Sequence, residues 1–244
     1  MNSRLYISKL IKFFLFKLFK KDNLIKKVNN QKIIFSVNNS ITFDRALYYY
    51  EKETLEWIND FKDGEVFWDV GSCVGVYSLY AALSKKCKVF AFEPFIPNFN
   101  LAQKNFALND VEDKCNIFNF FISNTSHIDD MFISKNYAGA SQQLDKKLNE
   151  VLTKKIMKVS IDDLVEKFNF EVPNHIKIDV ERSETELIEG FKKTLGNKRL
   201  KTVAIECHES NFDFIELKLS ENNFILKKKV KQSDLDTMNY FYKL

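Results

Sequence analysis

EVFWDVGSCVG, residues 65–75, contains an apolar run at residues 66–70 that includes a single acid and leads into a loop with two glycines. Such a run is typical of a strand buried on both faces of a parallel sheet. Gly71 permits a tight turn after the strand, and Gly75 permits a ligand or a neighbouring strand to approach the backbone closely. Residues 76–84 then have a helical pattern. The stretch therefore predicts a strand–loop–helix unit of an α/β fold.

The rest of the chain repeats this alternation. Strands are expected at residues 88–92, 116–122, 176–180 and 200–207, and helices at residues 97–109, 184–194 and 212–222, with a further helix beginning near Asp162. Repeated strand–helix units predict a mostly parallel sheet with helices on both faces. Residues 224–230 and 238–244 have no helix between them, which predicts an antiparallel hairpin at one edge of the sheet. Residues 123–155 are polar, and we expect an irregular excursion there.

The first 28 residues form a basic, amphipathic segment ahead of a domain that we place at residues 29–244, with its core at 64–244. Between residues 4 and 27, Leu, Ile and Phe alternate with Lys and Arg. A helix of this kind fits an anionic membrane surface, and it fits equally a helix packed on the domain or on a partner subunit. Residues 32–37 and 40–43 are expected to form two short strands around Asn38 and Asn39, and residues 51–61 a helix.

Composition restricts the function classes. A net charge of +4 over 244 residues is too small to indicate nucleic-acid binding. The four cysteines have neither the spacing nor the histidine neighbours of a zinc site, and we expect free thiols and no metal. No signal peptide is evident, and no uncharged apolar run reaches the roughly 18 residues of a membrane span. The expected location is cytoplasmic, at the inner face of the membrane if the basic segment binds lipid.

The glycine loop and one acid predict a cofactor site. The spacing G-x-x-x-G after Asp69 is not the dinucleotide pattern G-x-G-x-x-G, but the N–H groups at the start of the following helix can hold a polar or anionic group. Glu93 ends the next strand, about 20 residues later, where an acid binds ribose hydroxyls in such folds. A carboxylate can accept hydrogen bonds from both vicinal hydroxyls.

Further acids end the later strands. Asp179 and Glu181 follow a buried strand at its carboxyl end, the edge where ligands bind in open α/β sheets. They could orient the amine of a cofactor, hold a substrate hydroxyl or act as a base. His208, near the end of the next strand, is the histidine best placed to accept a proton near neutral pH, although a surface histidine in a loop fits the sequence equally well.

Five blocks of sequence together resemble the FkbM-type methyltransferases. They are EVFWDVGSCVG (65–75), FAFEPFIPN (90–98), VSIDDL (159–164), IKIDVERSE (176–184) and AIECH (204–208). They follow one another in the order of the family, and residues 51–61 resemble the helix that precedes the glycine loop. The resemblance covers roughly residues 45–209.

The resemblance implies a Rossmann-like class I methyltransferase with S-adenosylmethionine as methyl donor. It implies O-methylation of hydroxyls on sugars, polyketides or related small molecules. It carries over Asp69, Gly71, Gly75 and Glu93 as cofactor residues, and Asp179 and Glu181 as the acidic block at the edge of methyl transfer. The chain departs from the usual Gly-Ala-Asn-x-Gly at Ser72 and Cys73, and from the usual Gly-Ala after the acidic strand at Arg182 and Ser183.

The prediction is therefore an O-methyltransferase that acts on a hydroxyl of a sugar, a glycan or a related small molecule, with Asp179 or His208 as the base. Its partner is a small-molecule or glycan acceptor, and nucleic acid is not expected. If the basic segment docks on a membrane, a lipid-linked glycan is a sensible acceptor. Two alternatives stay open: a nicotinamide-dependent oxidoreductase on a similar sheet, and a non-catalytic binding protein derived from a methyltransferase.

Overall fold

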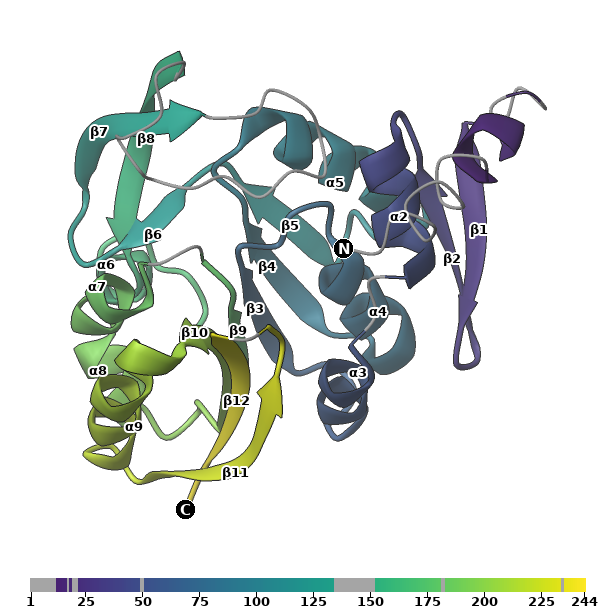
Figure 1. Ribbon diagram of the computed structural model, residues 1–244. Helices are drawn as coiled ribbons and strands as arrows, with labels where there is room; N and C mark the ends of the chain where they lie inside the picture. Colours follow the sequence, from purple (N-terminus) through teal and green to yellow (C-terminus); the bar gives the residue numbers. More distant parts are fainter. Residues whose placement is uncertain are drawn as a thin grey trace.

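The computed structural model describes residues 12–16, 18, 22–48, 51–133, 152–180, 183–233 and 235–244. Its centre is a seven-stranded sheet in the order β11-β12-β10-β9-β3-β4-β5 (Figure 1). The parallel strands are β3 (Val66–Val70), β4 (Lys88–Phe92), β5 (Cys115–Phe118), β9 (His175–Ile178) and β10 (Thr202–His208). Residues 66–70 are all buried, as the apolar run predicts.

The order of strands reverses between β3 and β9. Along the chain β3 is followed by β4 and β5 on one side, and β9 and β10 lie on the other side of β3. In open α/β sheets such a reversal leaves a crevice outside the carboxyl ends of the strands, and ligands bind there. The topology therefore places the candidate site next to the loop that follows β3.

Helices cover both faces of the sheet. One face packs on α3 (Lys52–Asn59), α4 (Val76–Lys85) and α5 (Ile96–Leu108). The other packs on α6 (Ile161–Glu166), α7 (Glu184–Glu189), α8 (Lys192–Gly196) and α9 (Phe212–Ser220). The single helix expected at residues 184–194 is thus two short helices, which separate around Gly190 and Phe191. Figure 1 shows the two groups of helices on opposite sides of the sheet.

The predicted edge hairpin is confirmed. β11 (Phe224–Lys231) and β12 (Asp236–Lys243) are antiparallel, and β12 also pairs antiparallel with β10. The fold is therefore the Rossmann-like, mostly parallel arrangement that the sequence predicts. Among the residues described, no helix has the length and apolar character needed to cross a bilayer.

The N-terminal extension differs from expectation. β1 (Asn23–Val28) and β2 (Gln31–Ser36) form an antiparallel hairpin, so the segment expected to be helical through residue 27 is a strand from Asn23, and the boundary placed after residue 28 falls in the turn. Asn29 has a φ of 51°, a left-handed conformation that asparagine tolerates and that tight hairpin turns require. The strand predicted at residues 32–37 is present as β2, but the strand predicted at residues 40–43 is wrong, because these residues belong to α2 (Ser40–Tyr48).

Asn39 explains this second difference. Its Oδ1 accepts hydrogen bonds from the backbone N–H groups of Ile41 and Thr42, at 3.0 and 2.8 Å. This is how an asparagine caps the first turn of a helix. Asn39, which was predicted to lie in a hairpin turn, therefore caps the N-terminus of α2. This helix packs through Phe43 against the domain.

The excursion after β5 is more regular than expected. The strand expected at 116–122 divides into β5 and β6 (Phe121–Ser123), and β6 joins β7 (His127–Ile133) and β8 (Leu152–Ser160) in a three-stranded sheet. Met131, Ile133 and Ile156 are buried against Phe95 and Phe121. Charged residues occupy the outward positions of this small sheet, which is why the segment looked irregular in sequence.

Candidate functional site

The glycine loop is held against two neighbouring strands. The backbone N–H groups of Gly71 and Ser72 both donate to the carbonyl of Phe92, at 2.9 and 3.1 Å. Gly71 has a φ of 80°, and a Cβ atom on it would lie 1.9 Å from the backbone oxygen of Asp179. Only glycine fits this position, because the backbone conformation and the close approach both exclude a side chain.

The loop then turns into α4 at Gly75. This residue also has a positive φ, of 79°, and a Cβ on it would lie 2.6 Å from the ring of Phe106 in α5. Between the glycines, Cys73 has a φ of 51°, which is unfavourable for a residue other than glycine or asparagine. The usual asparagine of the resembled family suits this conformation better than the cysteine found here. Both predicted glycines therefore have the special backbone conformation that a tight ligand loop requires.

Asp69 lies beneath the loop with only 1% of its surface exposed. Its Oδ2 accepts hydrogen bonds from the backbone N–H and the hydroxyl of Ser78, at 3.1 and 2.6 Å, which ties the end of β3 to α4. Its Oδ1 is buried and has no hydrogen-bond partner among the described residues, and the same holds for the hydroxyl of Ser72. Burial raises the pKa of Asp69, against the effect of the Lys177 ammonium. An orphaned buried acceptor beside the loop is what a polar ligand group would satisfy.

Glu93 reaches back to the same loop from the end of β4. Its two oxygens accept from the backbone N–H groups of Cys73 and Phe95, at 2.8 and 2.9 Å, and its side chain is buried. Burial raises the pKa of Glu93 to about 7, although these N–H groups favour the ionised form. The side chain of Asn98 is a further hydrogen-bond partner of this carboxylate. Glu93 can accept from ribose hydroxyls through the acceptor capacity that remains. The acid predicted to bind ribose also fixes the glycine loop.

Further polar residues, Asp69, Lys177, Asp179 and Glu206, form a row across the ends of β3, β9 and β10 on the α4 face of the sheet, and we call them the acid row. Asp69 is the register partner of Lys177, which is 1% exposed and donates to Asp179 Oδ2 at 2.6 Å. The ammonium of Lys177 also lies 5.0 Å from the ring centre of Tyr77. Burial disfavours the ammonium, but the surrounding carboxylates of Asp179, Glu51 and Asp69 outweigh it and raise the pKa of Lys177. Lys177 therefore stays charged inside the sheet.

Glu206 completes the row. β9 and β10 are parallel with Ile178 opposite Ile205, so Asp179 and Glu206 are the next neighbours along the two strands. Neighbouring positions of parallel strands face the same side, and here that side carries Lys177 and Asp69. Burial and the Asp179 carboxylate raise the pKa of Glu206 to about 8. The structure thus gathers Asp69, Lys177, Asp179 and Glu206 at the edge next to the glycine loop.

His208 stands apart from this group. His208 lies two residues beyond Glu206 in β10, and its Nδ1 is held in the following turn by the hydroxyl and backbone N–H of Ser210, at 2.8 and 3.2 Å. Glu181 lies outside the described residues, as does Arg182. Their predicted roles remain predictions.

Sequence reasoning missed the roles of Lys177 and Glu206. Lys177 alternates with Ile176 and Ile178 in a strand whose four residues are all buried. A charged residue inside such a run is the available signal, because lysine is almost never fully buried unless it is paired. Glu206 carries the same signal, since it interrupts the apolar strand β10 two residues before His208, the last residue of the strand.

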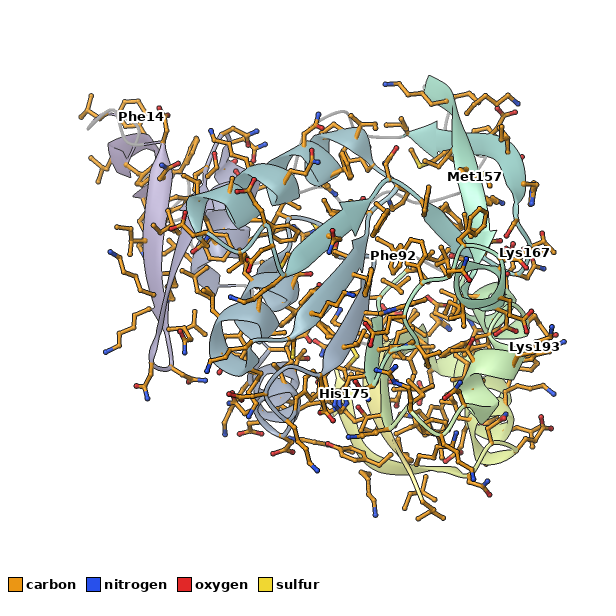
Figure 2. The ribbon with its side chains drawn as sticks, turned by 180° about the vertical axis from the view of Figure 1, so that it is seen from behind. Phe14, Phe92, Met157, Lys167, His175 and Lys193 are labelled. Carbon is orange, nitrogen blue, oxygen red and sulfur yellow. The ribbon has the colours of Figure 1, made fainter. Side chains whose placement is uncertain are left out.

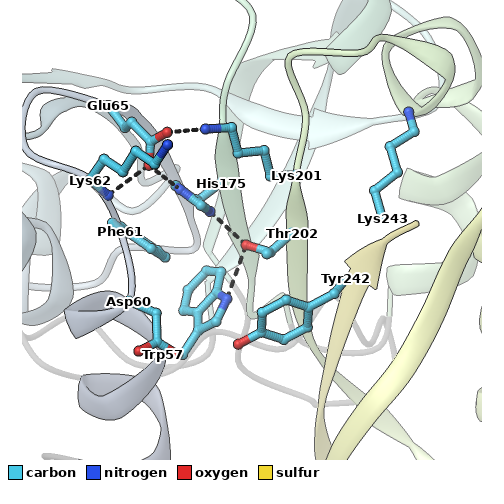
Figure 3. A pocket seen from close by; sticks show the side chains of 10 residues that line it. All are labelled: Trp57, Asp60, Phe61, Lys62, Glu65, His175, Lys201, Thr202, Tyr242 and Lys243. Atoms are coloured by element: carbon cyan, nitrogen blue, oxygen red, sulfur yellow. Dashed lines mark hydrogen bonds and ion pairs between the residues drawn. The ribbon is translucent and has the colours of Figure 1, made fainter.

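A cavity of about 320 Å³ lies at the opposite, amino edge of the sheet (Figure 3). Its wall is a chain of hydrogen bonds in which Glu65 bonds His175, and Thr202 bonds both His175 and the Trp57 indole. Burial lowers the pKa of His175 to about 4, so this ring is neutral at physiological pH. These polar side chains satisfy one another. The cavity is at the opposite edge of the sheet from the loop, and the residues predicted to bind a cofactor do not line it.

The loop and the acid row fit a nucleoside with a charged amino-acid tail. Glu93 can take ribose hydroxyls, the unpartnered oxygen of Asp69 can take an ammonium or hydroxyl hydrogen, and the loop N–H groups can take a carboxylate. With its strand order and edge hairpin, this site defines a Rossmann-like methyltransferase fold.

The chain belongs to the FkbM methyltransferase family, because the methyltransferase FkbM domain matches residues 69–226, more than half of its length. The solved structure of a methyltransferase FkbM from Methylobacillus flagellatus has the same fold, with a TM-score of 0.54 at 19% identity over 75% of this chain and 44% of that one.

Two curated methyltransferases are similar in sequence. Hexuronic acid methyltransferase AglP of Haloferax volcanii is 28% identical over 153 residues, which are 62% of this chain and 59% of that protein. A tRNA (guanine(37)-N(1))-methyltransferase of Dictyostelium discoideum is 29% identical over 97 residues, which are 40% of this chain and 21% of that protein. The chain thus spans less than two thirds of the length of either relative.

Proposed function

We propose that this protein is an S-adenosylmethionine-dependent O-methyltransferase that acts on a hydroxyl of a sugar, a glycan or a related small molecule. The observation that carries the proposal is the meeting of Gly71, Asp69 and Glu93 at the edge where the strand order reverses. Membership of the FkbM family supports methyl transfer. The similarity to an enzyme named for hexuronic acid supports a sugar acceptor.

Each residue of the site has a distinct part in binding. Glu93 would accept from the ribose hydroxyls while it holds the Cys73 N–H, so ribose binding and loop geometry are coupled. Asp69 would take a polar hydrogen on its unpartnered oxygen. When bound, the cofactor supplies an electrophilic methyl group on a positively charged sulfur. The main task of the protein is then to align that methyl group with the acceptor oxygen.

The charged residues at the carboxyl edge of the sheet suit a ligand with a positively charged sulfur. Asp69, Asp179 and Glu206 supply three carboxyl groups around the single ammonium of Lys177. An edge with surplus carboxyl groups favours a bound cation, because opposite charges attract strongly where water is partly excluded.

Calorimetric titration of S-adenosylmethionine into the full chain tests the proposal. We expect micromolar binding that Glu93→Gln weakens at least tenfold. Glu112→Gln is the matched control, because Glu112 is an exposed acid away from the loop. Transfer of a labelled methyl group to a panel of nitrophenyl glucosides and glucuronides then tests the acceptor class.

The same titration separates the alternatives. Binding of a nicotinamide dinucleotide in place of S-adenosylmethionine would make the chain an oxidoreductase. A folded wild type that binds neither ligand would identify it as a non-catalytic relative, with Cys73 in place of asparagine as the first suspect. Tight RNA or DNA binding at physiological salt would overturn the choice of a small acceptor.

We also propose that the N-terminal helical residues contact an anionic membrane from the cytoplasmic side. Phe13 and Phe16 pack on Phe43 of α2, with ring centres 5.7 and 5.2 Å away. The intervening apolar side chains point outward: Phe14 is 66% exposed and Leu15 47%. Figure 2 shows Phe14 at the outer margin of the molecule, beside β1.

The charge beside this apolar face supports a lipid partner. Leu18 is also exposed, and lysines 12, 26, 27 and 32 lie in the same extension. Apolar side chains flanked by lysines bind anionic lipid through both burial and charge. A membrane-bound acceptor such as a lipid-linked glycan would then reach the enzyme at this surface.

Vesicle flotation tests the membrane contact. We expect the full chain to float with vesicles that contain phosphatidylglycerol and not with pure phosphatidylcholine. Serine at positions 14, 15 and 18 should abolish flotation, whereas serine at Ile128 and Leu217, which are exposed elsewhere, should not. Equal flotation of both variants would overturn the membrane contact. A wild-type dimer that becomes monomeric when serine replaces residues 14, 15 and 18 would also overturn it.

A further inference from the structure

Glu206 belongs to the acid row, but the proposed binding of the cofactor gives it no role. It is the strand neighbour of Asp179, on the same face of the sheet as Lys177. Within the part of the chain that the structure describes, no hydrogen bond holds its carboxyl group. Every other acid of the row has a fixed partner: Asp69 accepts from Ser78, and Asp179 accepts from Lys177.

Among the described residues, four charged groups act on Glu206, and they come from three places in the fold. Asp179 and Lys177 come from β9, Glu51 from the start of α3, and Asp236 from the start of β12. Three of these four are acids, so the one cation does not neutralise the group. Glu51 is itself held by the hydroxyl of Thr54 at 2.6 Å, and Thr54 in turn contacts the hydroxyl of Tyr240.

We propose that Glu206 is the proton acceptor of methyl transfer, and that Lys177 is a positioning residue that holds Asp179 in place beside it. This inference rests on the proposed function, because it presupposes a bound sulfonium and a hydroxyl acceptor. It replaces neither Glu93 nor the glycine loop in cofactor binding. The proposed base is thus neither Asp179 nor His208, the two residues that the sequence predicted for this role.

The step balances with these groups alone. The acceptor oxygen forms a bond to the methyl carbon while the carbon–sulfur bond breaks, and the electron pair of that bond stays on sulfur as a neutral thioether. The acceptor hydroxyl loses its proton to the Glu206 carboxylate. Glu206 becomes a neutral acid and passes the proton to solvent, which reaches it because the side chain is only partly buried.

Asp179 is already engaged in an ion pair, because Lys177 donates to its Oδ2 at 2.6 Å. A carboxylate oxygen that already accepts from a buried ammonium has less capacity left to accept the proton of a substrate hydroxyl than a carboxylate without such a partner. Glu206 has the opposite environment, and burial together with Asp179 raises its pKa to about 8. A base whose pKa lies near the working pH is the most effective proton acceptor.

His208 is the competing base. Its Nδ1 is engaged by Ser210 in the turn that begins η1 (Glu209–Asn211), and its side chain lies further out along β10 than Glu206. For His208 to act on the same hydroxyl, the acceptor would have to lie two residues beyond the acid row. Variants of the two residues therefore distinguish two positions of the acceptor.

The first test uses S-adenosylmethionine and S-adenosylhomocysteine, and needs no acceptor. The sulfonium charge lowers the pKa of a nearby acid, so binding of S-adenosylmethionine at pH 7.5 should release protons from Glu206. Titrations in buffers of different ionisation enthalpy count those protons. We expect the wild type to release more protons with S-adenosylmethionine than with S-adenosylhomocysteine, and Glu206→Gln to remove that difference. Glu209→Gln, an exposed acid three residues away, should retain it.

The outcomes are distinct. If the wild type fails to bind S-adenosylmethionine, the proposed function falls and this inference falls with it. If it binds but releases the same protons as Glu206→Gln, only the assignment of Glu206 is overturned. Loss of the proton difference in His208→Gln but not in Glu206→Gln would assign the base to His208.

A kinetic test follows once a glycoside of the panel is methylated. Glu206→Gln should lower kcat by about 10²- to 10⁴-fold with little change in the affinity for S-adenosylmethionine. The wild-type rate should fall as the pH drops below about 8, since the base is then protonated. Lys177→Met should move this pH profile, because the ammonium sets the charge around both acids. A Lys177 variant with a lower rate but an unmoved profile would contradict the positioning role.

Discussion

A Cβ atom at Gly71 would lie 1.9 Å from the backbone oxygen of Asp179, so the glycine loop and the acidic end of β9 are in direct backbone contact. The contact joins the two parts of the proposed site, because the loop carries groups proposed to bind the cofactor and the end of β9 carries part of the acid row. Neither part can shift without the other. The positive φ of Gly71 is the condition for this closeness.

Gly71→Ala should therefore lower the free energy of unfolding by more than the strain of a positive φ alone. A residue other than glycine at positive φ costs about 1–3 kcal/mol, and here the methyl group must also push the β9 backbone away. We expect the free energy of unfolding to fall by about 3 kcal/mol and S-adenosylmethionine binding to be lost. Urea unfolding and calorimetric titration measure the two effects.

Gly64→Ala is the matched control for Gly71→Ala. Gly64 has the same φ of 80°, but no atom lies within 4 Å of the Cβ position. It should lose only the conformational part, about 1 kcal/mol, and keep its cofactor affinity. Equal losses of stability in the two variants would show that the contact with Asp179 adds nothing.

Cys73→Asn should stabilise the protein. Cys73 has a φ of 51°, and asparagine adopts this left-handed conformation at lower cost than cysteine. We expect a gain of about 0.5–1 kcal/mol in urea unfolding and tighter binding of S-adenosylmethionine. Cys73→Ser is the control, since serine has a similar size without the conformational preference. A gain in the serine variant as large as that of asparagine would point to the thiol rather than to the backbone.

The sequence predicts the central sheet well because its strands are buried on both faces. Continuous apolar runs such as residues 66–70 and 88–92 mark such strands, and the absence of a helix after residue 230 marks the edge hairpin. The peripheral elements were predicted poorly for a physical reason. Asn29 and Asn39 have similar local sequence signals, but one forms a turn and the other caps a helix, and packing around each decides which.

The site was predictable where one strand end determined it. Gly71 and Glu93 each follow a strand directly, and Gly75 directly precedes α4, so their place at the sheet edge follows from topology. The contact between Lys177, Asp179 and Glu206 depends on the register between β9 and β10, which no local pattern encodes. A lysine between buried isoleucines and a glutamate within the apolar strand β10 were the available clues to that register-dependent group.

Binding of S-adenosylmethionine should depend on pH through Glu93. Burial raises the pKa of Glu93 to about 7, and only the ionised carboxylate accepts from both ribose hydroxyls while holding the loop. We expect the affinity to weaken by about tenfold between pH 8 and pH 5, as the carboxylate takes up its proton. Glu93→Gln should bind weakly at both values, with a flat profile. A wild-type affinity that is constant over this range would exclude a role for the Glu93 charge.

Glu206→Gln should make the protein more stable at high pH, although it removes the proposed base. The folded pKa of Glu206, about 8, lies above its ordinary value of 4.5, so the folded state favours the protonated acid. The corresponding stability is present at low pH and is lost as the pH rises from about 4.5 to about 8. Glutamine resembles the protonated acid at every pH, so the variant should match the wild type at pH 5 and exceed it by on the order of 2 kcal/mol at pH 9. Urea unfolding at both values measures this, with Glu209→Gln as the control that should show no such trend. A pH-independent difference between Glu206→Gln and the wild type would mean that the acid is already ionised in the folded protein at pH 5, and its value as a proton acceptor near neutral pH would be lost.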